Sequence, residues 1–258
     1  MAHERKARLP ADRTSAGPLP AGVGAPARTA SLAIVAGFAG LVACLLVFGT
    51  LAEDVRSNEV FALDTFVTPL IHGVASPTLD FLMNAATTAG SNLVIPPLFV
   101  AEIAILLWIR RPGAALFQAV VSGGALLLSG LMKVFFHRPR PILPWAQALP
   151  DFSFPSGHTM NAFAFYVGLA IVVWSIAGRR WGLAALTAAF VVTGFVGLSR
   201  IYLGVHYPTD VLGAVLAGSI WVLVVLAAFR SRPLSRFWFG TSAGRTSEPS
   251  AGAGAGGD

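Results

Sequence analysis

Three short clusters of charged and polar residues hold the side chains that could do chemistry in this chain of 258 residues. Among their residues are three cations, Lys133, Arg140 and Arg200, the histidines His158 and His206, a carboxylate and a Ser-Gly pair, a set suited to binding and transferring a phosphoryl group. The clusters are Lys133-Val-Phe-Phe-His-Arg-Pro-Arg140-Pro141, then Pro155-Ser156-Gly157-His158, and then Ser199-Arg200-Ile-Tyr-Leu-Gly-Val-His206-Tyr-Pro-Thr-Asp210.

The cations and the Ser-Gly pair are suited to hold phosphoryl oxygens. Arg140 and Arg200 carry planar forks that match phosphate geometry, and Lys133 adds a compact charge. Ser156 and Gly157 follow a proline at the start of an apolar segment, where a helix N-terminus offers free N–H groups to an anion. We therefore expect these five residues to form a phosphate-binding site.

The two histidines and the aspartate are suited to nucleophilic and acid–base catalysis. His206 and Asp210 are four residues apart at the start of an apolar segment. A carboxylate at that distance can accept one imidazole N–H and leave the other ring nitrogen free to attack. His158 begins another apolar segment, from which it could protonate a leaving oxygen.

Each of these residues also has an ordinary structural explanation. Asp210 could only stabilise a helix N-terminus, and a single interfacial histidine is more often structural than catalytic. Arg138 and Arg140 could be interface anchors. Lys133 is harder to explain in this way, because it lies within an apolar run. All the structural explanations would have to hold together at one membrane surface, which favours the functional interpretation.

The three clusters resemble the signature of the type 2 phosphatidic acid phosphatase superfamily. That signature is Lys-x6-Arg-Pro, Pro-Ser-Gly-His and Ser-Arg-x5-His-x3-Asp, and this sequence matches all eleven positions in order. The resemblance implies that His206 is the nucleophile that forms a phosphohistidine, that Asp210 orients it, and that His158 is the general acid. It also implies that the phosphoryl oxygens are bound by Lys133, Arg140, Arg200, Ser156 and Gly157.

The composition indicates that these clusters belong to a polytopic membrane protein. Apolar residues make up 55% of the chain and charged residues only 12%, about half the ~25% of a soluble domain. Fibrous and disulfide-rich classes are excluded, since the 27 glycines have no triplet period and Cys44 is the only cysteine. The chain is thus predicted to be all-α, with six membrane-spanning helices near 31–52, 92–109, 113–136, 158–178, 181–199 and 210–229.

The basic residues predict the orientation of these spans. Of the 18 Lys and Arg residues, 13 lie in the N-terminal tail, after the second and fourth spans, or after the sixth span, and 5 lie on the other side. The positive-inside rule then places both termini in the cytoplasm and the three clusters at the extracytoplasmic face, as in membrane members of the family. The net charge of +6 is therefore interpreted as a topology signal and not as a sign of nucleic-acid binding.

The expected domain organisation is one membrane domain between two polar tails. Residues 1–30 are rich in Ala, Pro, Gly and Arg, and residues 231–258 include a Gly/Ala/Ser-rich end, so both tails are predicted to be disordered and cytoplasmic. The six-helix phosphatase domain is predicted to cover 31–230.

Several features outside the signature can be interpreted in two ways. The segment 53–91 is either an amphipathic stretch at the outer interface or an ordinary loop with a short helix. Glu102 either faces the bundle interior or a substrate path, or is a hydrogen-bonded structural carboxyl. Two further groups are treated as interfacial or near the headgroup site: the pair His137 and Arg138, and the aromatic residues Trp145 and Tyr202, which are expected in an interfacial aromatic belt.

The predicted function is that of an integral-membrane phosphatase acting on a lipid phosphate or pyrophosphate. Undecaprenyl pyrophosphate, phosphatidate and phosphatidylglycerophosphate all stay open as substrates, as does the oligomeric state. No metal-site pattern is visible, so we expect a metal-independent enzyme without a cofactor. The alternatives are a non-enzymatic membrane scaffold or transporter and, as the family also includes them, a vanadate-dependent haloperoxidase.

Overall fold

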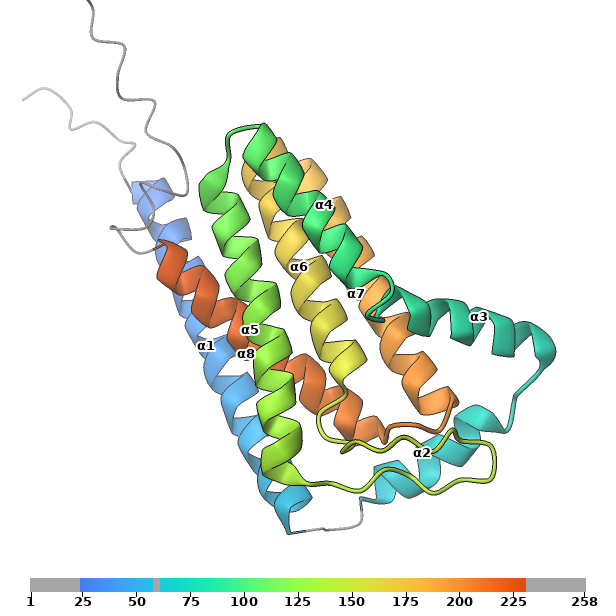
Figure 1. The fold of residues 1–258 in the computed structure, drawn as a ribbon. Coiled ribbons are helices and arrows are strands. Elements are labelled where there is room, and N and C mark those ends of the chain that lie inside the picture. Colours follow the sequence, from blue (N-terminus) through green and yellow to red (C-terminus); the bar gives the residue numbers. More distant parts are fainter. Residues whose placement is uncertain (1–23, 58–60, 231–258) are drawn as a thin grey trace, which may run out of the picture. The chain divides into compact units, whose positions relative to one another are not determined.

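The structure is a computed structural model that describes residues 24–57 and 61–230, and the regular secondary structure of this part of the chain consists of helices (Figure 1). Its eight helices are α1 (Gly24–Arg56), α2 (Ala62–His72), α3 (Pro77–Ala89), α4 (Ile95–Trp108), α5 (Pro112–Phe136), α6 (Gly157–Ala177), α7 (Arg179–Tyr202) and α8 (Pro208–Arg230). The all-α prediction is confirmed for the described residues.

The chain divides into two compact units, residues 1–39 and 40–258. The described part of the first unit is the beginning of α1, which starts at Gly24, inside the segment predicted as a tail. All three motif clusters lie in the second unit. The predicted tail 231–258 and the rest of the N-terminal tail lie outside the described residues.

Five helices of the described part are long and apolar enough to cross a membrane: the Gly37–Arg56 part of α1, and α5, α6, α7 and α8. The second predicted span corresponds to α4, which has 14 residues. At 1.5 Å per residue this helix is about 21 Å long, shorter than a hydrocarbon core of about 30 Å. A sixth crossing by α4 therefore stays a prediction.

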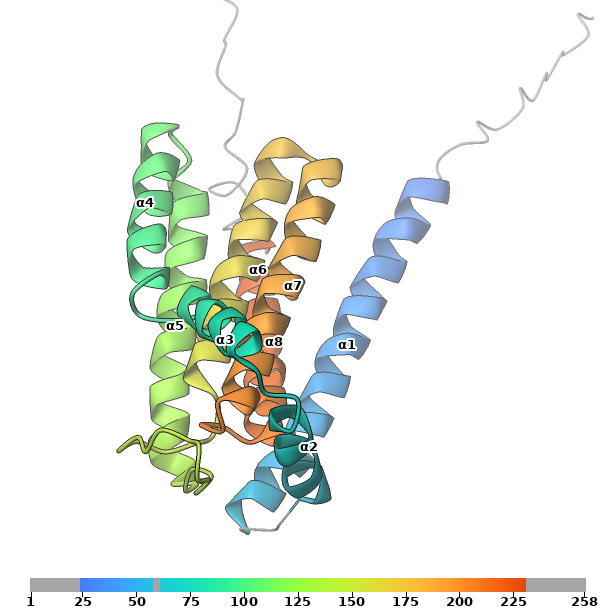
Figure 2. The ribbon, with the colours of Figure 1, turned by 90° about the vertical axis from the view of Figure 1, so that its right-hand side faces the viewer.

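Helix α6 lies at the centre of the second unit, in contact with α5, α7 and α8 (Figure 2). Close approach depends on small residues at the contacts. An added Cβ on Gly168 would lie 2.4 Å from Oε1 of Gln118 on α5, and one on Gly218 of α8 would lie 2.9 Å from the ring of Phe163. The core that results holds α6 firmly between its neighbours, so its N-terminus is a fixed point for the site.

Much of the segment 53–91 is helical and packs against the bundle. It forms the end of α1 and the helices α2 and α3, of which α2 packs against α7 and α8, and α3 packs against α7. Asp64 and Thr68 of α2 are buried, 4% and 3% exposed. Neither sequence interpretation anticipated a buried carboxylate here, because periodicity alone does not reveal a distant cationic partner.

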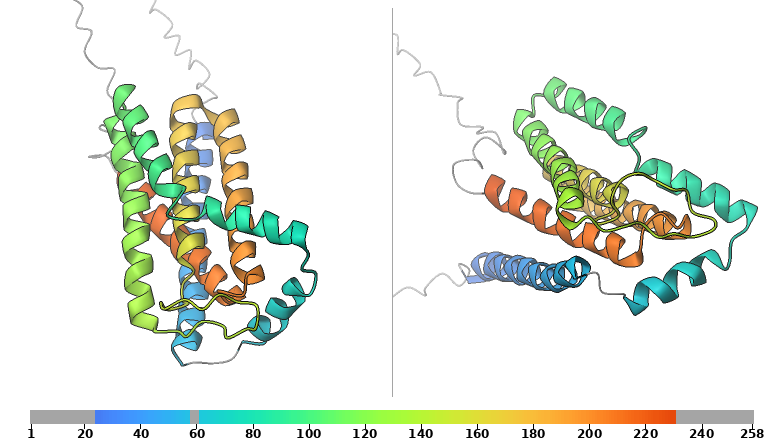
Figure 3. Two further views of the ribbon diagram at one scale, coloured as in Figure 1. Left: turned by 45° about the vertical axis from the view of Figure 1, so that its right-hand side comes forward. Right: turned by 60° about the horizontal axis from the view of Figure 1, so that its bottom comes forward.

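The connections of the second unit bring the three motif clusters to one end of the bundle (Figure 3). The α5–α6 connection, residues 137–156, and the α7–α8 connection, residues 203–207, lie at the same end. The α4–α5 and α6–α7 connections lie at the opposite end. This antiparallel order of α5 to α8 is what allows distant motifs to form one site.

Candidate active site

The three clusters surround a cavity of about 360 Å³. Six of the eight residues predicted to form the site line it: Lys133, Arg140, Gly157, His158, Arg200 and His206. The other two, Ser156 and Asp210, are fully buried behind the wall. The structure thus brings the predicted residues together from α5, α6, α7, α8 and the two connections.

Local sequence explains how the first cluster turns back towards the bundle. His137 caps α5 in the left-handed conformation, with φ 48°, and its N–H donates to the carbonyl of Lys133 at 3.1 Å. Pro139 and Pro141 then prevent any continuation of the helix. The chain therefore leaves α5 at this point, and Arg140 comes to lie beside His206 while Lys133 stays in the last turn.

The N-terminus of α6 is fixed to the α8 side of the site. The N–H of Ser156 donates to the backbone carbonyl of Asp210 at 3.1 Å, and its hydroxyl pairs with that of Thr159 at 3.0 Å. Gly157 is the first helical residue, and the first N–H groups of a helix have no partner inside it. A Cβ on Gly157 would lie 3.7 Å from Cε of Lys133, an ordinary contact distance, so this end of the helix borders the cavity beside a cation and its free N–H groups can bind an anion.

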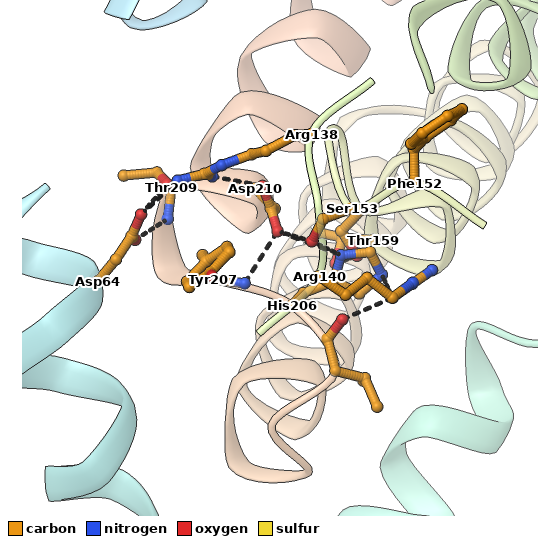
Figure 4. Close-up of polar contacts among 12 residues, drawn as sticks. Asp64, Arg138, Arg140, Phe152, Ser153, Thr159, His206, Tyr207, Thr209 and Asp210 are labelled. Atoms are coloured by element: carbon orange, nitrogen blue, oxygen red, sulfur yellow. Dashed lines mark hydrogen bonds and ion pairs between the residues drawn. The ribbon is translucent and has the colours of Figure 1, made fainter. Parts of the chain in front are cut away.

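His206 is held with one ring nitrogen towards Asp210 and the other towards Arg140 (Figure 4). Its Nδ1 lies 3.4 Å from Oδ2 of Asp210, and its Nε2 lies 3.1 Å from Nη1 of Arg140. Arginine can only donate, so Nε2 must be the acceptor and the proton is assigned to Nδ1. Burial lowers the pKa of His206 to about 4, although Asp210 opposes this shift, so the ring is neutral at pH 7.

Asp210 lies in the first turn of α8 and is fully buried. Its Oδ2 accepts hydrogen bonds from the hydroxyl of Ser153 and, at 2.9 Å, from the N–H of Tyr207. Its Oδ1 accepts from Nη1 of Arg138 at 2.6 Å. These contacts fix the carboxylate that faces His206, and they come from both connections at this end of the bundle.

Arg138 is neither an interface anchor nor part of the cavity wall. It is 8% exposed and is paired with Asp210 on one side and with Asp64 of α2 on the other, at 2.7 Å (Figure 4). Burial alone would lower the pKa of Arg138, but the charges of Asp210 and Asp64 raise it above the ordinary value.

Two of the cavity cations hold a carboxylate of the protein itself. Lys133 Nζ lies 2.5 Å from Oδ2 of Asp151, and Nη2 of Arg140 lies 2.7 Å from Oδ1. Burial would raise the pKa of Asp151, but the hydrogen bonds from Lys133 and Arg140 outweigh it and lower this pKa to about 2. The side chain of Asp151 is 52% exposed. An exposed anion therefore lies where phosphoryl oxygens would bind.

Asp151→Asn is expected to strengthen the binding of inorganic phosphate and vanadate. The variant removes an anion that competes for Lys133 and Arg140, and ion pairs of this exposure are worth roughly 0.2–1 kcal/mol, so inhibition constants should fall by about 1.4- to 5-fold. Titration of activity with each inhibitor measures the effect. Weaker binding of both anions in a folded variant would contradict this competition.

Arg200 lines the cavity, and one donor of its side chain has no partner in the described part of the chain. Its Nη1 donates to the hydroxyl of Thr87 on α3 at 2.7 Å, while its Nε is buried and has no hydrogen-bond partner among the described residues. The same holds for Oδ1 of Asn161, which lines the cavity one turn after His158. Unpaired buried polar atoms are costly, and both of these side chains belong to residues of the cavity wall.

The structure changes the interpretation of several other residues. Tyr202 is 3% exposed and donates to Asp80 of α3 at 2.6 Å, so it is not a belt aromatic. Trp145 stacks on the ring of His72 with centroids 4.1 Å apart, which ties the 137–156 connection to α2. Glu102 is buried and lines a separate, apolar cavity between α4 and α6, with no hydrogen-bond partner for its oxygens among the described residues.

Sequence reasoning missed five polar residues that contact the predicted site residues or Arg138: Asp64, Thr87, Asp151, Ser153 and Thr209. Asp64 and Thr87 lie in the segment without a motif, and the other three stand between or within the clusters as ordinary polar residues. The sequence carries no signal for these contacts. The proximity of Asp151 to two cations of the signature is seen only in the folded chain.

Comparison with known proteins assigns this chain to a family. A family model described as the PAP2 superfamily matches residues 114–233. Phosphatidylglycerophosphatase B of Bacillus subtilis (strain 168) is 30% identical over 187 residues, which cover 71% of this chain and 92% of the relative. The chain belongs to the PAP2 superfamily.

Two further matches extend the PAP2 assignment. The putative undecaprenyl-diphosphatase YbjG of Escherichia coli (strain K12) is 30% identical over 163 residues, 57% of this chain and 78% of the relative. The crystal structure of a transmembrane PAP2 type phosphatidylglycerolphosphate phosphatase from Bacillus subtilis superposes with a TM-score of 0.67 at 30% identity, covering 73% of this chain and 94% of the other. This PAP2 chain is therefore an integral, multi-pass membrane protein.

Proposed function

We propose that the chain is a membrane phosphatase that hydrolyses a lipid phosphate or diphosphate through a phosphohistidine on His206. One observation carries the proposal. The Nε2 atom of a buried, neutral histidine faces a cavity lined by Lys133, Arg140 and Arg200, with the carboxylate of Asp210 behind the ring. A neutral imidazole backed by a carboxylate is a competent nucleophile, and the cations match the charge of a phosphoryl group.

The proposed reaction has two displacements at phosphorus. In the first, Nε2 of His206 forms the bond to phosphorus while the bond to the leaving oxygen breaks, and His158 gives its proton to that oxygen. In the second, water attacks the phosphohistidine, its proton passes to His158, and phosphate leaves His206 unmodified. Asp210 stabilises the positive charge that the ring carries in between.

The phosphoryl oxygens would be held by groups that surround Nε2. The three cations and the free N–H groups at the start of α6, next to Ser156 and Gly157, supply donors from several sides. The charge that develops on the oxygens in each displacement is stabilised by groups already in place, which is the main source of catalysis expected for such a site. We expect metal-independent activity for this reason.

We propose a lipid as the substrate because the site lies at the end of a membrane-spanning bundle and includes apolar walls, Leu126 of α5 and Leu149. The names of the relatives give phosphatidylglycerophosphate and undecaprenyl diphosphate as substrates of those proteins. A lipid of either kind could keep its tails in the bilayer while its phosphate enters the cavity. The activity is proposed to reside in residues 31–230.

A substrate panel on purified protein in micelles tests this function. We expect kcat/KM for a long-chain lipid phosphate or polyprenyl diphosphate to exceed that for a water-soluble phosphate by about 100-fold or more, because each CH₂ left in the apolar phase avoids a cost of ~0.8 kcal/mol. The control is His206→Ala, and parallel assays with EDTA test metal independence. Equal kcat/KM for a soluble sugar phosphate would reject the lipid assignment, and vanadate-dependent halide oxidation would favour the haloperoxidase alternative.

We propose that both termini are cytoplasmic and that the cavity opens on the extracytoplasmic side. Support comes from the basic residues of the second unit. Arg110 and Arg111, Arg179 and Arg180 lie at the α4–α5 and α6–α7 connections, opposite to the cavity, whereas the cations of the three clusters have partners within the site.

Single-cysteine labelling tests this orientation. In a Cys44→Ser background, Gln147→Cys on the exposed 137–156 connection should react with an impermeant thiol reagent in intact cells, and Ala177→Cys at the other end of α6 should react only after the cells are opened. Ala177 avoids Gly178, whose φ of 84° disfavours a side chain, and keeps both arginines. The reverse pattern would overturn the proposed orientation.

A further inference from the structure

A buried chain of charges runs from α2 to the aspartate behind His206 (Figure 4). Nη2 of Arg138 lies 2.7 Å from Oδ2 of Asp64, and Nη1 lies 2.6 Å from Oδ1 of Asp210. The exposed fractions of the three side chains are 9%, 4% and 0%. The residues come from α2, the 137–156 connection and α8, so three separate elements have to meet to form this chain.

We propose that Asp64 is a positioning residue of the reaction, which acts through Arg138 on Asp210 and so keeps the charge of Asp210 available to His206. This inference rests on the proposed function. Asp64 lies outside the segment that matches the family model, residues 114–233, and belongs to none of the three motif clusters.

The first step of the argument is the balance of charge. Arg138 carries one positive charge and contacts two carboxylates, so the group as a whole has a surplus of one negative charge. That surplus matches the positive charge that the ring of His206 gains when it forms a bond to phosphorus. If Asp64 were neutral, Arg138 would have Asp210 as its only anionic partner here, and the carboxylate would stabilise the charged ring less well.

The second step is geometry. A guanidinium presents a rigid fork, so two partners held at its two ends fix its plane as well as its position. In addition, Arg138 stacks over the ring of Tyr207, with Cζ 4.4 Å from the ring centroid, and donates to the hydroxyl of Thr209 at 2.7 Å. Asp64, at the other end of the guanidinium, therefore sets the direction of the hydrogen bond that Arg138 donates to Asp210.

The third step is that Asp64 also holds the first turn of α8. Its Oδ1 accepts from the N–H of Thr209 at 2.9 Å, and its Oδ2 accepts from the hydroxyl of the same residue at 2.6 Å. Thr209 immediately precedes Asp210, so a carboxylate on α2 occupies the position of an N-terminal cap for α8. Asp64 thus reaches Asp210 by two routes, through the guanidinium and through the backbone.

The test uses two anions that depend on His206 to different extents. Vanadate can adopt the five-coordinate geometry of the transition state beside Nε2 of His206, whereas inorganic phosphate binds to the cations without that bond. In Asp64→Asn, which keeps size and removes the charge, we expect kcat to fall and the vanadate inhibition constant to rise, each by about 10- to 100-fold. KM and the phosphate inhibition constant should stay within about 3-fold of wild type, since the cavity cations are unchanged.

Thr68→Val is the matched control. Thr68 lies one turn after Asp64 on the same helix, is similarly buried, and its hydroxyl has no hydrogen-bond partner among the described residues. The variant has nearly the same shape, and we expect kcat and both inhibition constants to stay near the wild-type values. If α2 had a purely structural role, Asp64→Asn would instead weaken phosphate and vanadate binding together. Thermal unfolding of each variant reports on folding separately.

Arg138→Lys is the second variant, in case Asp64→Asn does not fold. Lysine keeps the positive charge but cannot form a fork between two carboxylates, so the same split between vanadate and phosphate is expected. The inference is overturned if folded Asp64→Asn or folded Arg138→Lys keeps wild-type kcat and vanadate inhibition, or loses vanadate and phosphate binding equally. Failure of the proposed function is seen separately, as equal turnover by the wild type and His206→Ala.

Discussion

His206→Ala is expected to lower kcat by about 10⁴-fold or more and to abolish a trapped phosphoenzyme. Alanine offers no atom to form the bond to phosphorus, and removal of a nucleophile costs most of the chemical acceleration, because the remaining groups act through it. Substrate should still bind, since the cations of the cavity are untouched. Steady-state kinetics with a long-chain lipid phosphate, together with an alkaline quench of enzyme mixed with radiolabelled substrate, which preserves the acid-labile phosphohistidine, measure both effects.

The control for this variant is another histidine at the same end of the bundle. His137 lies against the ring of Phe152, 4.6 Å between centroids, and does not line the cavity. Asparagine tolerates its left-handed conformation, so His137→Asn should fold and keep nearly full activity. Near-wild-type turnover in His206→Ala would refute the covalent mechanism outright.

The second large effect is expected for His158→Ala, and its size should depend on the leaving group. A general acid contributes about 10²- to 10⁴-fold when the leaving oxygen is a poor one, such as the alkoxide of a phosphatidate. An aryl phosphate with an acidic phenol needs little protonation, so its kcat should fall by much less. The comparison is made within one variant, which cancels changes in folding and in phosphate binding.

The same comparison also distinguishes the substrate classes. When a diphosphate is cleaved, the leaving group is a phosphate monoester, which departs more readily than an alkoxide, so the loss in His158→Ala should be intermediate. A uniform loss for all three kinds of substrate would remove His158 from the role of acid and leave it as a residue of the cavity wall.

The fold class and the composition of the cavity could be predicted because their signals are local. Apolar runs bounded by charges indicated the long helices, and the three clusters stand at the ends of those runs. Once consecutive spans run antiparallel, motifs at alternate connections must come to one end. Six of the eight predicted residues accordingly line one cavity.

The remaining contacts were not predictable, since they depend on pairs far apart in the sequence. The sequence places Arg138 beside the headgroup site or at the interface. Its partner Asp64 lies 74 residues earlier, in an amphipathic segment, so nothing in the sequence indicates this ion pair. Tyr202 was assigned to an aromatic belt on residue type, but its hydroxyl finds Asp80 of α3. Sequence spacing carries no information on such pairs, and only the packing of α2 and α3 creates them.

The carboxylate of Asp151 has a consequence for the end of the catalytic cycle. A cavity with several fixed cations binds the product phosphate as readily as the substrate, and strong retention of product would limit turnover. Because Asp151 is tethered beside Lys133 and Arg140, it can take over their hydrogen bonds as the phosphate departs. We therefore expect Asp151 to act as a replacement anion that speeds product release at the expense of initial affinity for the substrate.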